Sequence, residues 1–390
     1  IQVTTNGEWL KAQQTTLGAD NGIAIALSMA LVEDDTISHP GLELLFTVDE
    51  ESGLNGAKKL DPDLFEGRVL LNLDSETEGE FTIGCAGGMD THISYQPRFC
   101  SLPGSFQVIS VKVSGLSGGH SGIDIHKERG SANVILARVL QQLTERFDQR
   151  IISIQGGTAH NAIARDAEAL VAYPTAHLDA ASGQLADLEK MLQNEYESVE
   201  PGLSISFDAG TRNEVEGRCF TEDSAATCLQ MLVAMPHGPV ARSTAMSDLV
   251  ETSTNFARVK TTASTVDILT SQRSSVASRL LEISSRIEAL ARLARAQVRC
   301  NNGYPPWQPD PASPLLRRCK AVFRKTFDTD PEVVAINAGL ECALIGDRTH
   351  GMQMISFGPT IENPHSPDER LHIPSIGRIW DFLTALLASL

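Results

Sequence analysis

The sequence has little of what membrane proteins, nucleic-acid-binding proteins and disulfide-stabilised proteins need. Its 390 residues contain no apolar run near the roughly 18 residues that span a bilayer. Basic residues are scarce, with 32 Lys and Arg against 49 Asp and Glu, which gives a formal net charge of −17. Phosphate binding needs clustered Lys and Arg. We therefore expect neither a membrane nor a nucleic acid as a partner.

Cysteine pairs are also missing. There are seven cysteines, an odd number, and no two of them form a C-x-x-C motif. This argues against a disulfide framework and against a thiolate zinc site, and favours reduced thiols in a cytoplasmic protein. Apolar residues make up 42% and charged residues 21%, an ordinary globular balance. A chain of this length can bury a large core and suggests two or three domains.

Strand and helix patterns alternate at both ends of the chain, which predicts an α/β fold with a mostly parallel sheet. The predicted elements are helices at residues 23–32, 315–327 and 376–390, and strands at residues 42–48, 69–73 and 352–357. The middle of the chain differs. Residues 108–113 alternate like a half-exposed strand, residues 132–143 predict a helix, and residues 275–298 predict a long amphipathic helix. We therefore predict an α/β domain, residues 1–88 and 304–390, interrupted by an α+β domain at residues 89–303.

Acidic residues gather where the predicted strands end. Glu50 and Glu51 follow the strand at 42–48, Asp74 follows the strand at 69–73, and Asp20 lies in a loop before a helix. His365 follows the strand at 352–357. Open parallel sheets bind ligands at the carboxyl ends of their strands. Carboxylates crowded together need a cation, and carboxylates plus histidine without thiolates suit Zn²⁺ or Mn²⁺. Taken singly, each motif is more often a turn or a solvated charge pair.

Their order along the chain resembles a known family, the aminoacyl-histidine dipeptidase branch of the M20 metallopeptidases. The matching segments are residues 15–23 (TTLGADNGI), 50–53, 73–76 (LDSE), 84–88 (GCAGG), 118–122 (GGHSG), 156–163, 251–253, 307–310 (WQPD), 338–342 (AGLEC), 358–360 and 364–369 (PHSPDE). The resemblance covers essentially the whole chain. It implies a zinc-peptidase-like catalytic domain and an inserted lid and dimerisation domain.

The resemblance also implies roles for the acidic residues. Asp20 would bridge two divalent metal ions, most simply zinc, with manganese or cobalt as alternatives. Glu51 and His365 would complete the site of one ion, and Asp74 would bind the other. Glu50 would be the general base that accepts a proton from a metal-activated water.

The inserted domain supplies further residues by the same resemblance. His120 would stabilise the oxyanion in the site of a partner subunit, which implies a homodimer. Asn255, Arg273 and Glu341 would bind substrate, and Arg suits a C-terminal carboxylate. From the residues alone, His120 reads as a histidine packed in a glycine-rich turn, and Arg273 as a surface charge.

Three positions depart from the family pattern. The family has a His-x-Asp motif upstream of the Asp20 position, whereas the first histidine here, His39, lies in a turn and is no substitute. His160 stands where an arginine is usual, and Asn337 where a histidine is usual. We expect a segment with the His-x-Asp motif to precede Ile1. Without it, residues 1–390 should be poorly soluble, bind about one metal ion and lack dipeptidase activity.

The resemblance therefore predicts metal-dependent hydrolysis of dipeptides, Xaa-His and broader. Two alternatives stay open. One is a related M20 aminoacylase or carboxypeptidase-like hydrolase. The other is a catalytically dead, metal-deficient dimeric binding protein.

Overall fold

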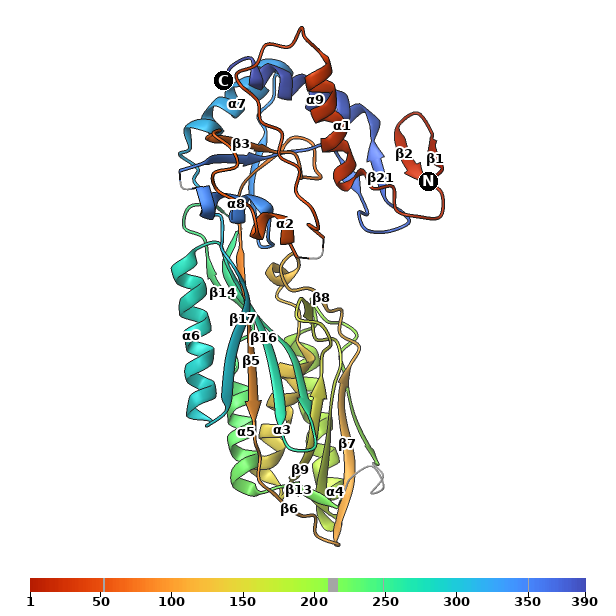
Figure 1. Cartoon of the computed structure of the whole chain (residues 1–390). Helices are drawn as coiled ribbons and strands as arrows, with labels where there is room; N and C mark the ends of the chain where they lie inside the picture. The colour runs from red at the N-terminus through yellow and green to blue at the C-terminus, as the bar shows by residue number, and fades with distance from the viewer. Residues whose placement is uncertain (52, 210–216, 248, 350) are drawn as a thin grey trace. The chain divides into compact units, whose positions relative to one another are not determined.

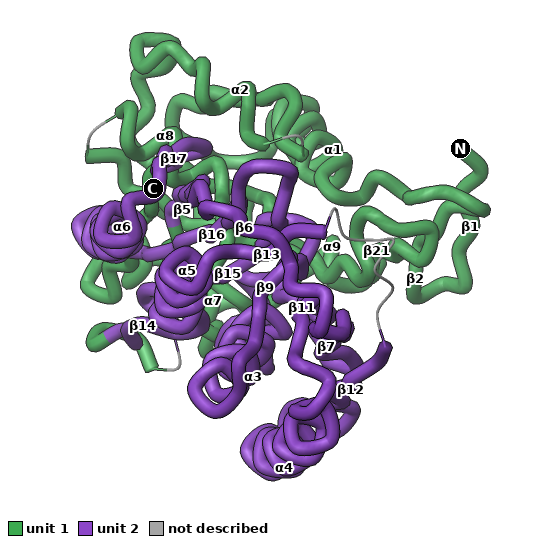
Figure 2. Tube along the Cα trace, turned by 90° about the horizontal axis from the view of Figure 1, so that it is seen from below, with its two compact units in different colours: residues 1–86, 244–247, 305–390 green, residues 87–243, 248–304 purple. Residues whose placement is uncertain are grey.

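The chain divides into two compact units (Figure 2). Unit 1 comprises residues 1–86, 244–247 and 305–390, and unit 2 comprises residues 87–243 and 248–304. The computed structural model describes residues 1–51, 53–209, 217–247, 249–349 and 351–390. Residues 244–247 belong to unit 1, although the sequence places them inside the predicted inserted domain.

Unit 1 is built around a four-stranded sheet (Figure 1). Its strands lie in the order β18 (Glu332–Ile336), β4 (Glu80–Cys85), β19 (Gln353–Ser356) and β3 (Val69–Asn72). β18 pairs with β4 in parallel and β3 pairs with β19 in parallel, whereas one antiparallel bridge joins β19 to β4. This confirms the predicted α/β class and the mostly parallel pairing.

Helices cover this sheet and bury an aromatic core. They are α1 (Ala19–Glu33), α2 (Asn55–Lys58), α7 (Pro314–Phe327), α8 (Glu341–Thr349) and α9 (Ile373–Leu387). Phe81 of β4 stacks on Phe382 of α9 at 5.0 Å between ring centroids, and meets Phe323 of α7 edge-on at 5.5 Å. Burial of such rings contributes most of the stabilisation of a core like this one.

A smaller antiparallel sheet completes unit 1. Its order is β1 (Val3–Thr5), β2 (Trp9–Ala12), β21 (Arg370–His372) and β20 (Ile361–Glu362). Because β20 and β21 flank the turn that carries His365, pairing with β2 fixes the position of that turn.

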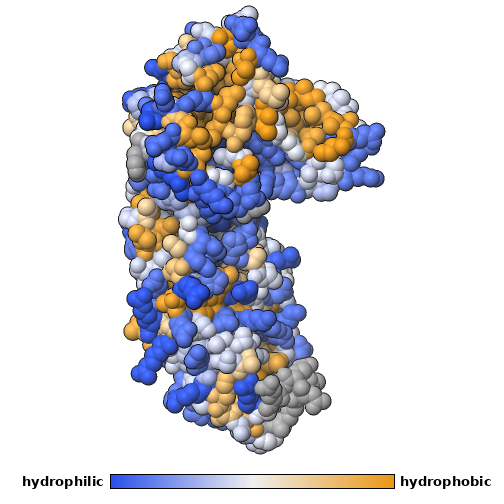
Figure 3. Space-filling model, in the orientation of Figure 1, coloured by the Kyte–Doolittle hydropathy of each residue, from blue (hydrophilic) through white to orange (hydrophobic). Residues whose placement is uncertain are grey.

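The strand predicted at residues 42–48 is wrong. The segment is irregular, and it pairs with no strand in the described part of the chain. A strand needs a ladder of hydrogen bonds to a neighbour, and Phe46 and Val48 are 53% and 72% exposed instead of packed. The segment lines a cavity of about 910 Å³ together with α1 and the edge strand β3. Figure 3 shows apolar residues gathered on the surface around α1.

Unit 2 contains a nine-stranded antiparallel sheet. The main path is β12 (Ser204–Ala209), β7 (Phe106–Ser114), β11 (Ala167–Pro174), β9 (Arg150–Gly156), β15 (Val250–Thr261), β16 (Val266–Ser274), β5 (Gly87–Tyr95) and β17 (Gln297–Tyr304), and β14 (Gly238–Arg242) pairs with β15. Two short pairs accompany it, β8 (Gly119–His120) with β10 (Ala162–Ile163), and β6 (Phe99–Ser101) with β13 (Arg218–Phe220).

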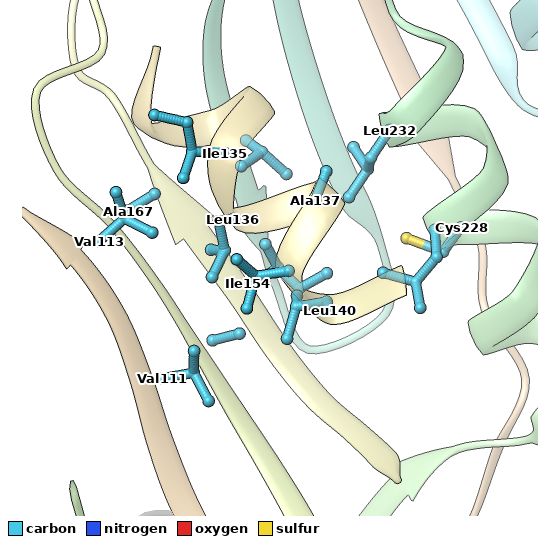
Figure 4. Packing of buried hydrophobic residues seen from close by; sticks show 14 of the residues in the cluster. Val111, Val113, Ile135, Leu136, Ala137, Leu140, Ile154, Ala167, Cys228 and Leu232 are labelled. Atoms are coloured by element: carbon cyan, nitrogen blue, oxygen red, sulfur yellow. The ribbon is translucent and has the colours of Figure 1, made fainter. Parts of the chain in front are cut away.

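Helices pack on this sheet through one large apolar core. They are α3 (Ala132–Arg146), α4 (Leu178–Glu195), α5 (Glu222–Ala234) and α6 (Ala277–Leu293). Figure 4 shows Leu136 and Leu140 of α3 lying over Val111 and Ile154 of the sheet. The predicted strand at 108–113 and helix at 132–143 are confirmed, so the middle of the chain is α+β as expected.

The helix predicted over residues 275–298 ends earlier than expected. α6 stops at Leu293, and Arg295 adopts the left-handed conformation with φ of 56°. The Ala296 amide then bonds back to the carbonyl of Ala291 at 2.9 Å, the closing bond of a Schellman motif. Within the described residues, no helix is both long and apolar enough to cross a bilayer.

Candidate metal centre and substrate-binding residues

Asp20 leaves the regular helix at the start of α1. Its backbone has φ −85° and ψ 104°, and it follows Gly18, whose φ of 75° favours glycine. The Asp20 backbone therefore departs from the regular helical conformation at this point. Its Oδ2 lies 2.8 Å from Nε2 of His365, a residue 345 positions away in the sequence.

Glu51 joins these two residues in a cluster of possible metal ligands. Its Oε1 lies 3.0 Å from the same Nε2 of His365. One ligand atom from each of Asp20, Glu51 and His365 falls within 4.8 Å of the others. Two carboxylates and one imidazole around a common point are a suitable donor set for a zinc-like divalent cation. The structure thus brings together three of the residues expected from the sequence.

Asp74 lies beside this cluster and is tied to the loop of Asp20. The side-chain amide of Asn21 donates to Asp74 Oδ1 and to the carbonyl of Leu73 at 3.1 Å. Burial raises the pKa of Asp74, and the negative charge of Asp20 adds to this rise. In the described residues, Asp74 has no third ligand group beside it that would complete a cluster of its own.

The carboxylates of this region are crowded. Burial, with the negative charges of nearby carboxylates, raises the pKa of Glu50, Asp74 and Glu76 to about 7 each. Partial burial works against protonation of His365, but its hydrogen bond to Asp20 and the charge of Glu51 raise its pKa. Carboxylates whose pKa values are raised in this way repel one another when ionised, and a bound cation would relieve that repulsion. The residues present therefore fit a divalent metal ion.

Glu341, at the start of α8, is almost fully buried among these acids. Its Oε2 accepts a hydrogen bond from Thr47 Oγ1 at 2.6 Å, and Oε1 has no partner among the described residues. Burial raises its pKa. A buried carboxylate oxygen without a donor is costly, and it marks a place where a ligand with N–H groups would be favoured.

These raised pKa values make metal affinity depend on pH. Metal binds the ionised carboxylates, so we expect metal affinity to fall as the pH is lowered from 8 to 6. For each proton that the metal must displace, the fall is up to about tenfold per pH unit. The stability of the metal-free protein should change in the opposite sense. Because the folded pKa of Asp74 lies near 7 instead of 3.8, protonation stabilises the fold at low pH, and this contribution is lost as the pH rises through 7.

Thermal unfolding of the metal-free and zinc-saturated protein between pH 6 and 8.5 checks this. The metal-free midpoint should fall as the pH rises toward 7 and level off above it, zinc should remove most of the fall, and Asp74→Asn should make the fall smaller, with the rest coming from Glu50 and Glu76. A fall of the same size in wild type and Asp74→Asn would show that Asp74 is not its source.

In unit 2, the hydrogen bonds to His120 determine which of its ring nitrogens carries the proton. Its Nδ1 accepts from the backbone amides of Gly122 and Ile123 at 3.2 and 3.1 Å, so in the neutral ring the proton is on Nε2. Burial and the positive charge of Arg273 lower the pKa of His120. The neutral ring is therefore favoured, and its Nε2–H can donate to a substrate oxygen.

Arg273 on β16 is a buried cation without a carboxylate partner in the described chain. It is 8% exposed, its Nη1 donates to the Tyr304 hydroxyl at 3.1 Å, and its Nε has no partner among described residues. An unpaired buried guanidinium is unfavourable unless a ligand anion pairs with it. Asn255 on β15 donates to the carbonyls of His160 and Ala162, and its Oδ1 is also left unpartnered in the described region.

Sequence reasoning missed three groups near these residues. His160 Nδ1 lies 3.1 Å from Oδ2 of buried Asp90, which also accepts from Asn302 at 2.9 Å. Glu76 lies close enough to Asp20 for its pKa to respond to that charge. Glu369 accepts hydrogen bonds from the loop that carries Asp20. The sequence signals were that His160 stands where the family usually has an arginine, and that Glu76 and Glu369 fall inside the motifs LDSE and PHSPDE.

Comparisons with known proteins identify the family of the chain. Residues 111–200 match the peptidase dimerisation domain model of the M20 family. The chain is 38% identical over 387 residues to the cytosol non-specific dipeptidase of Escherichia coli K12, covering 99% of this chain and 79% of that protein.

Solved structures give the same result. Aminoacylhistidine dipeptidase from Vibrio alginolyticus matches with a TM-score of 0.94 and 35% identity, covering all of this chain and 79% of the other. Aminopeptidase PepT from Bacillus cereus shares the fold with a TM-score of 0.53 at 14% identity, over 100% and 76% of the two chains. The resemblance seen in the sequence is confirmed: the chain belongs to the M20 family of peptidases, in the group that contains these two dipeptidases.

Proposed function

We propose that this protein is a metal-dependent dipeptidase that cleaves Xaa-His and other dipeptides. The observation that carries the proposal is the cluster of Asp20, Glu51 and His365 with the carboxylate of Glu50 beside it. Glu50 is not one of the clustered ligands, and it responds to the charges of Asp20 and Glu51. A carboxylate beside a metal site but outside its ligand set is placed to transfer protons.

The residues would hold one divalent ion and contribute ligands to a second, zinc in the first instance, with manganese and cobalt as alternatives. Asp20 would bridge the two, Glu51 and His365 would hold one, and Asp74 would contribute to the other. Bound ions of this kind make water more acidic and polarise the scissile carbonyl. Glu50 takes the proton from the attacking water and delivers it to the leaving amine nitrogen, so one residue serves both halves of the reaction.

The substrate-binding residues match the two charged ends of a dipeptide. Glu341 has a buried oxygen free to accept from the terminal ammonium. Arg273 has a buried Nε–H without a partner among the described residues, which suits the terminal carboxylate, and Asn255 has an Oδ1 that could accept a hydrogen bond from another substrate group. His120 offers the Nε2–H that would stabilise the oxyanion as charge develops on the carbonyl oxygen. A requirement for both charged ends favours a dipeptidase over an aminoacylase, whose substrate has no terminal ammonium.

We also propose that the protein is a cytoplasmic homodimer. The match to a peptidase dimerisation domain supports the dimer, and the name of the Escherichia coli relative supports the location. The roles of residues 1–88 and 304–390 as the catalytic domain and of residues 89–303 as the lid and dimerisation domain are part of this proposal.

Replacing Arg273 tests the function through its substrate. Arg273→Lys loses the bidentate geometry, so KM for an Xaa-His dipeptide should rise about 10- to 100-fold. The same dipeptide with an amidated C-terminus should be a poor substrate for wild type and nearly insensitive to the substitution. Steady-state kinetics on both substrates, with the N-acetylated dipeptide as a third, make the measurement.

The matched control is Arg279→Lys, since Arg279 is an exposed residue of α6 paired with Glu282. It should leave KM unchanged. If wild type prefers the N-acetylated substrate, the aminoacylase alternative is correct. If Arg273→Lys affects the free and amidated dipeptides equally, Arg273 does not bind the carboxylate.

A further inference from the structure

We propose that Glu369 is a positioning residue for the metal centre, which holds the loop of Asp20 in register with the turn of His365. The inference rests on the proposed metal centre of unit 1. It assigns Glu369 a role that neither its residue type nor the comparisons indicate.

The side chain of Glu369 reaches across to the start of α1. Its Oε2 accepts from the backbone amide of Gly18 at 2.8 Å, and its Oε1 accepts from the amides of Ala19 and Asp20 at 2.8 and 3.2 Å. Glu369 is 2% exposed. A single buried carboxylate thus receives three consecutive backbone N–H groups that the helix itself cannot satisfy.

These bonds are the reason a buried charge is tolerated at this position. No Lys, Arg or His in the described part of the chain pairs with Glu369. Charge-assisted bonds from backbone amides at a helix N-terminus stabilise an anion there. Both oxygens of Glu369 accept backbone hydrogen bonds, and Glu369 is not part of the cluster of possible metal ligands.

The same residue is fixed to the turn of His365. The Glu369 amide donates to the carbonyl of Ser366 at 3.1 Å, and Ser366 Oγ accepts from the Asp368 amide at 3.2 Å. His365 and Glu369 therefore belong to one short hydrogen-bonded turn, only four residues apart.

The hydrogen bonds of Glu369 affect how far apart two possible metal ligands, Asp20 and His365, lie. Asp20 Oδ2 and His365 Nε2 are 2.8 Å apart. The backbone of Asp20 is bonded to Glu369, and Glu369 is bonded within the turn of His365. Removing the carboxylate would free the two loops to separate, so the ligands would have to be reordered each time a metal ion binds. Such positioning groups typically change metal affinity 10- to 100-fold.

The test compares Glu369→Gln with Asp368→Asn in the whole protein. Both remove one negative charge from the same turn, but Asp368 is exposed, and its carboxylate makes no hydrogen bond or ion pair with the described residues. Glutamine keeps the size of the side chain but turns an N–H₂ group toward a backbone donor. Equilibrium dissociation constants for Zn²⁺ and Co²⁺ are measured against a competing chelator, and the unfolding midpoint of each metal-free protein is measured in parallel.

We expect Glu369→Gln to weaken metal binding 10- to 100-fold and Asp368→Asn to change it less than about twofold. The visible spectrum of bound Co²⁺ should change in Glu369→Gln alone, and saturating metal should restore most of kcat. Glu369→Asp, which is shorter but charged, should fall between wild type and Glu369→Gln and provides the test if the glutamine variant does not fold.

Unchanged metal affinity in Glu369→Gln or, should that variant not fold, in Glu369→Asp would overturn the inference. So would a lower metal-free midpoint with a wild-type dissociation constant, because that result describes a purely structural residue. Metal affinity is measured without substrate. A protein that binds metal in a Glu369-dependent way but cleaves no dipeptide would refute the proposed function and leave this inference standing.

Discussion

Glu50→Gln is expected to lower turnover of a dipeptide by at least about a thousandfold while the protein keeps its metal. General-base removal usually costs 10²–10⁴-fold. Glu50 lies among Glu51, Glu341 and Asp20, and burial together with their charges raises its pKa to about 7. Glutamine has nearly the same shape but cannot take the proton.

The neighbouring residue provides the matched control. Glu51→Gln removes the same charge one position away, but Glu51 belongs to the ligand cluster with Asp20 and His365. This variant should therefore lose metal, and its activity should recover partly at high metal concentration. Metal content and kcat are measured on both proteins. Full metal content with near-normal turnover in Glu50→Gln would remove Glu50 from the role of base.

The second large effect is a recovery of activity. His120→Ala and Glu50→Gln should each be nearly inactive. If His120 acts in the site of the partner subunit, a mixed dimer of the two variants has one site with both residues intact. After subunit exchange at equal concentrations, half of the dimers are mixed and half of their sites are complete, so about a quarter of wild-type activity should return.

Subunit exchange has to be demonstrated separately, with differently tagged chains. A mixture of His120→Ala with His120→Ala/Glu50→Gln is the control, because none of its sites can contain a complete set. Confirmed exchange without recovery would mean that His120 acts within its own chain or serves only the Gly-rich turn around it.

Much of the fold was predictable because the spacing of apolar residues within a segment indicates its secondary structure. The alternation at residues 108–113 and the apolar spacing of α3 depend on which face of an element is buried, and burial is visible in the sequence. The segment at residues 42–48 shows the limit of this reasoning. Its apolar residues predict a buried strand, but whether a strand forms depends on a neighbour to pair with, and sequence pattern says nothing about that.

The prediction of where α6 ends was wrong for a different reason. The apolar spacing continues through Val298, yet the helix closes at Leu293 with Arg295 in the left-handed conformation. Glycine usually occupies that position. Without a glycine in the sequence, the stop signal is absent, and only the Ala296 to Ala291 hydrogen bond reveals it.

The candidate site was predictable only through the order of its motifs. Asp20 and His365 are individually unremarkable, and 345 positions separate them, so no local pattern indicates a distance of 2.8 Å. The contacts of Glu369 were not predictable at all. They join the Glu369 side chain to backbone amides. Almost every residue has a backbone amide, so the residue types at positions 18–20 give no sign of these contacts.

If the carboxylates and His365 hold a catalytic metal ion, cleavage of dipeptides must depend on bound metal. Release of free histidine from an Xaa-His dipeptide is measured with the protein as its gene encodes it. The protein is first stripped by a chelator and then titrated with Zn²⁺, Mn²⁺ or Co²⁺ while metal content is recorded. We expect no release from the stripped protein, and release that rises with bound metal until the site is full. A protein that fills with each of these metals and still leaves the dipeptide intact would rule out the dipeptidase and would favour a dimeric binding protein.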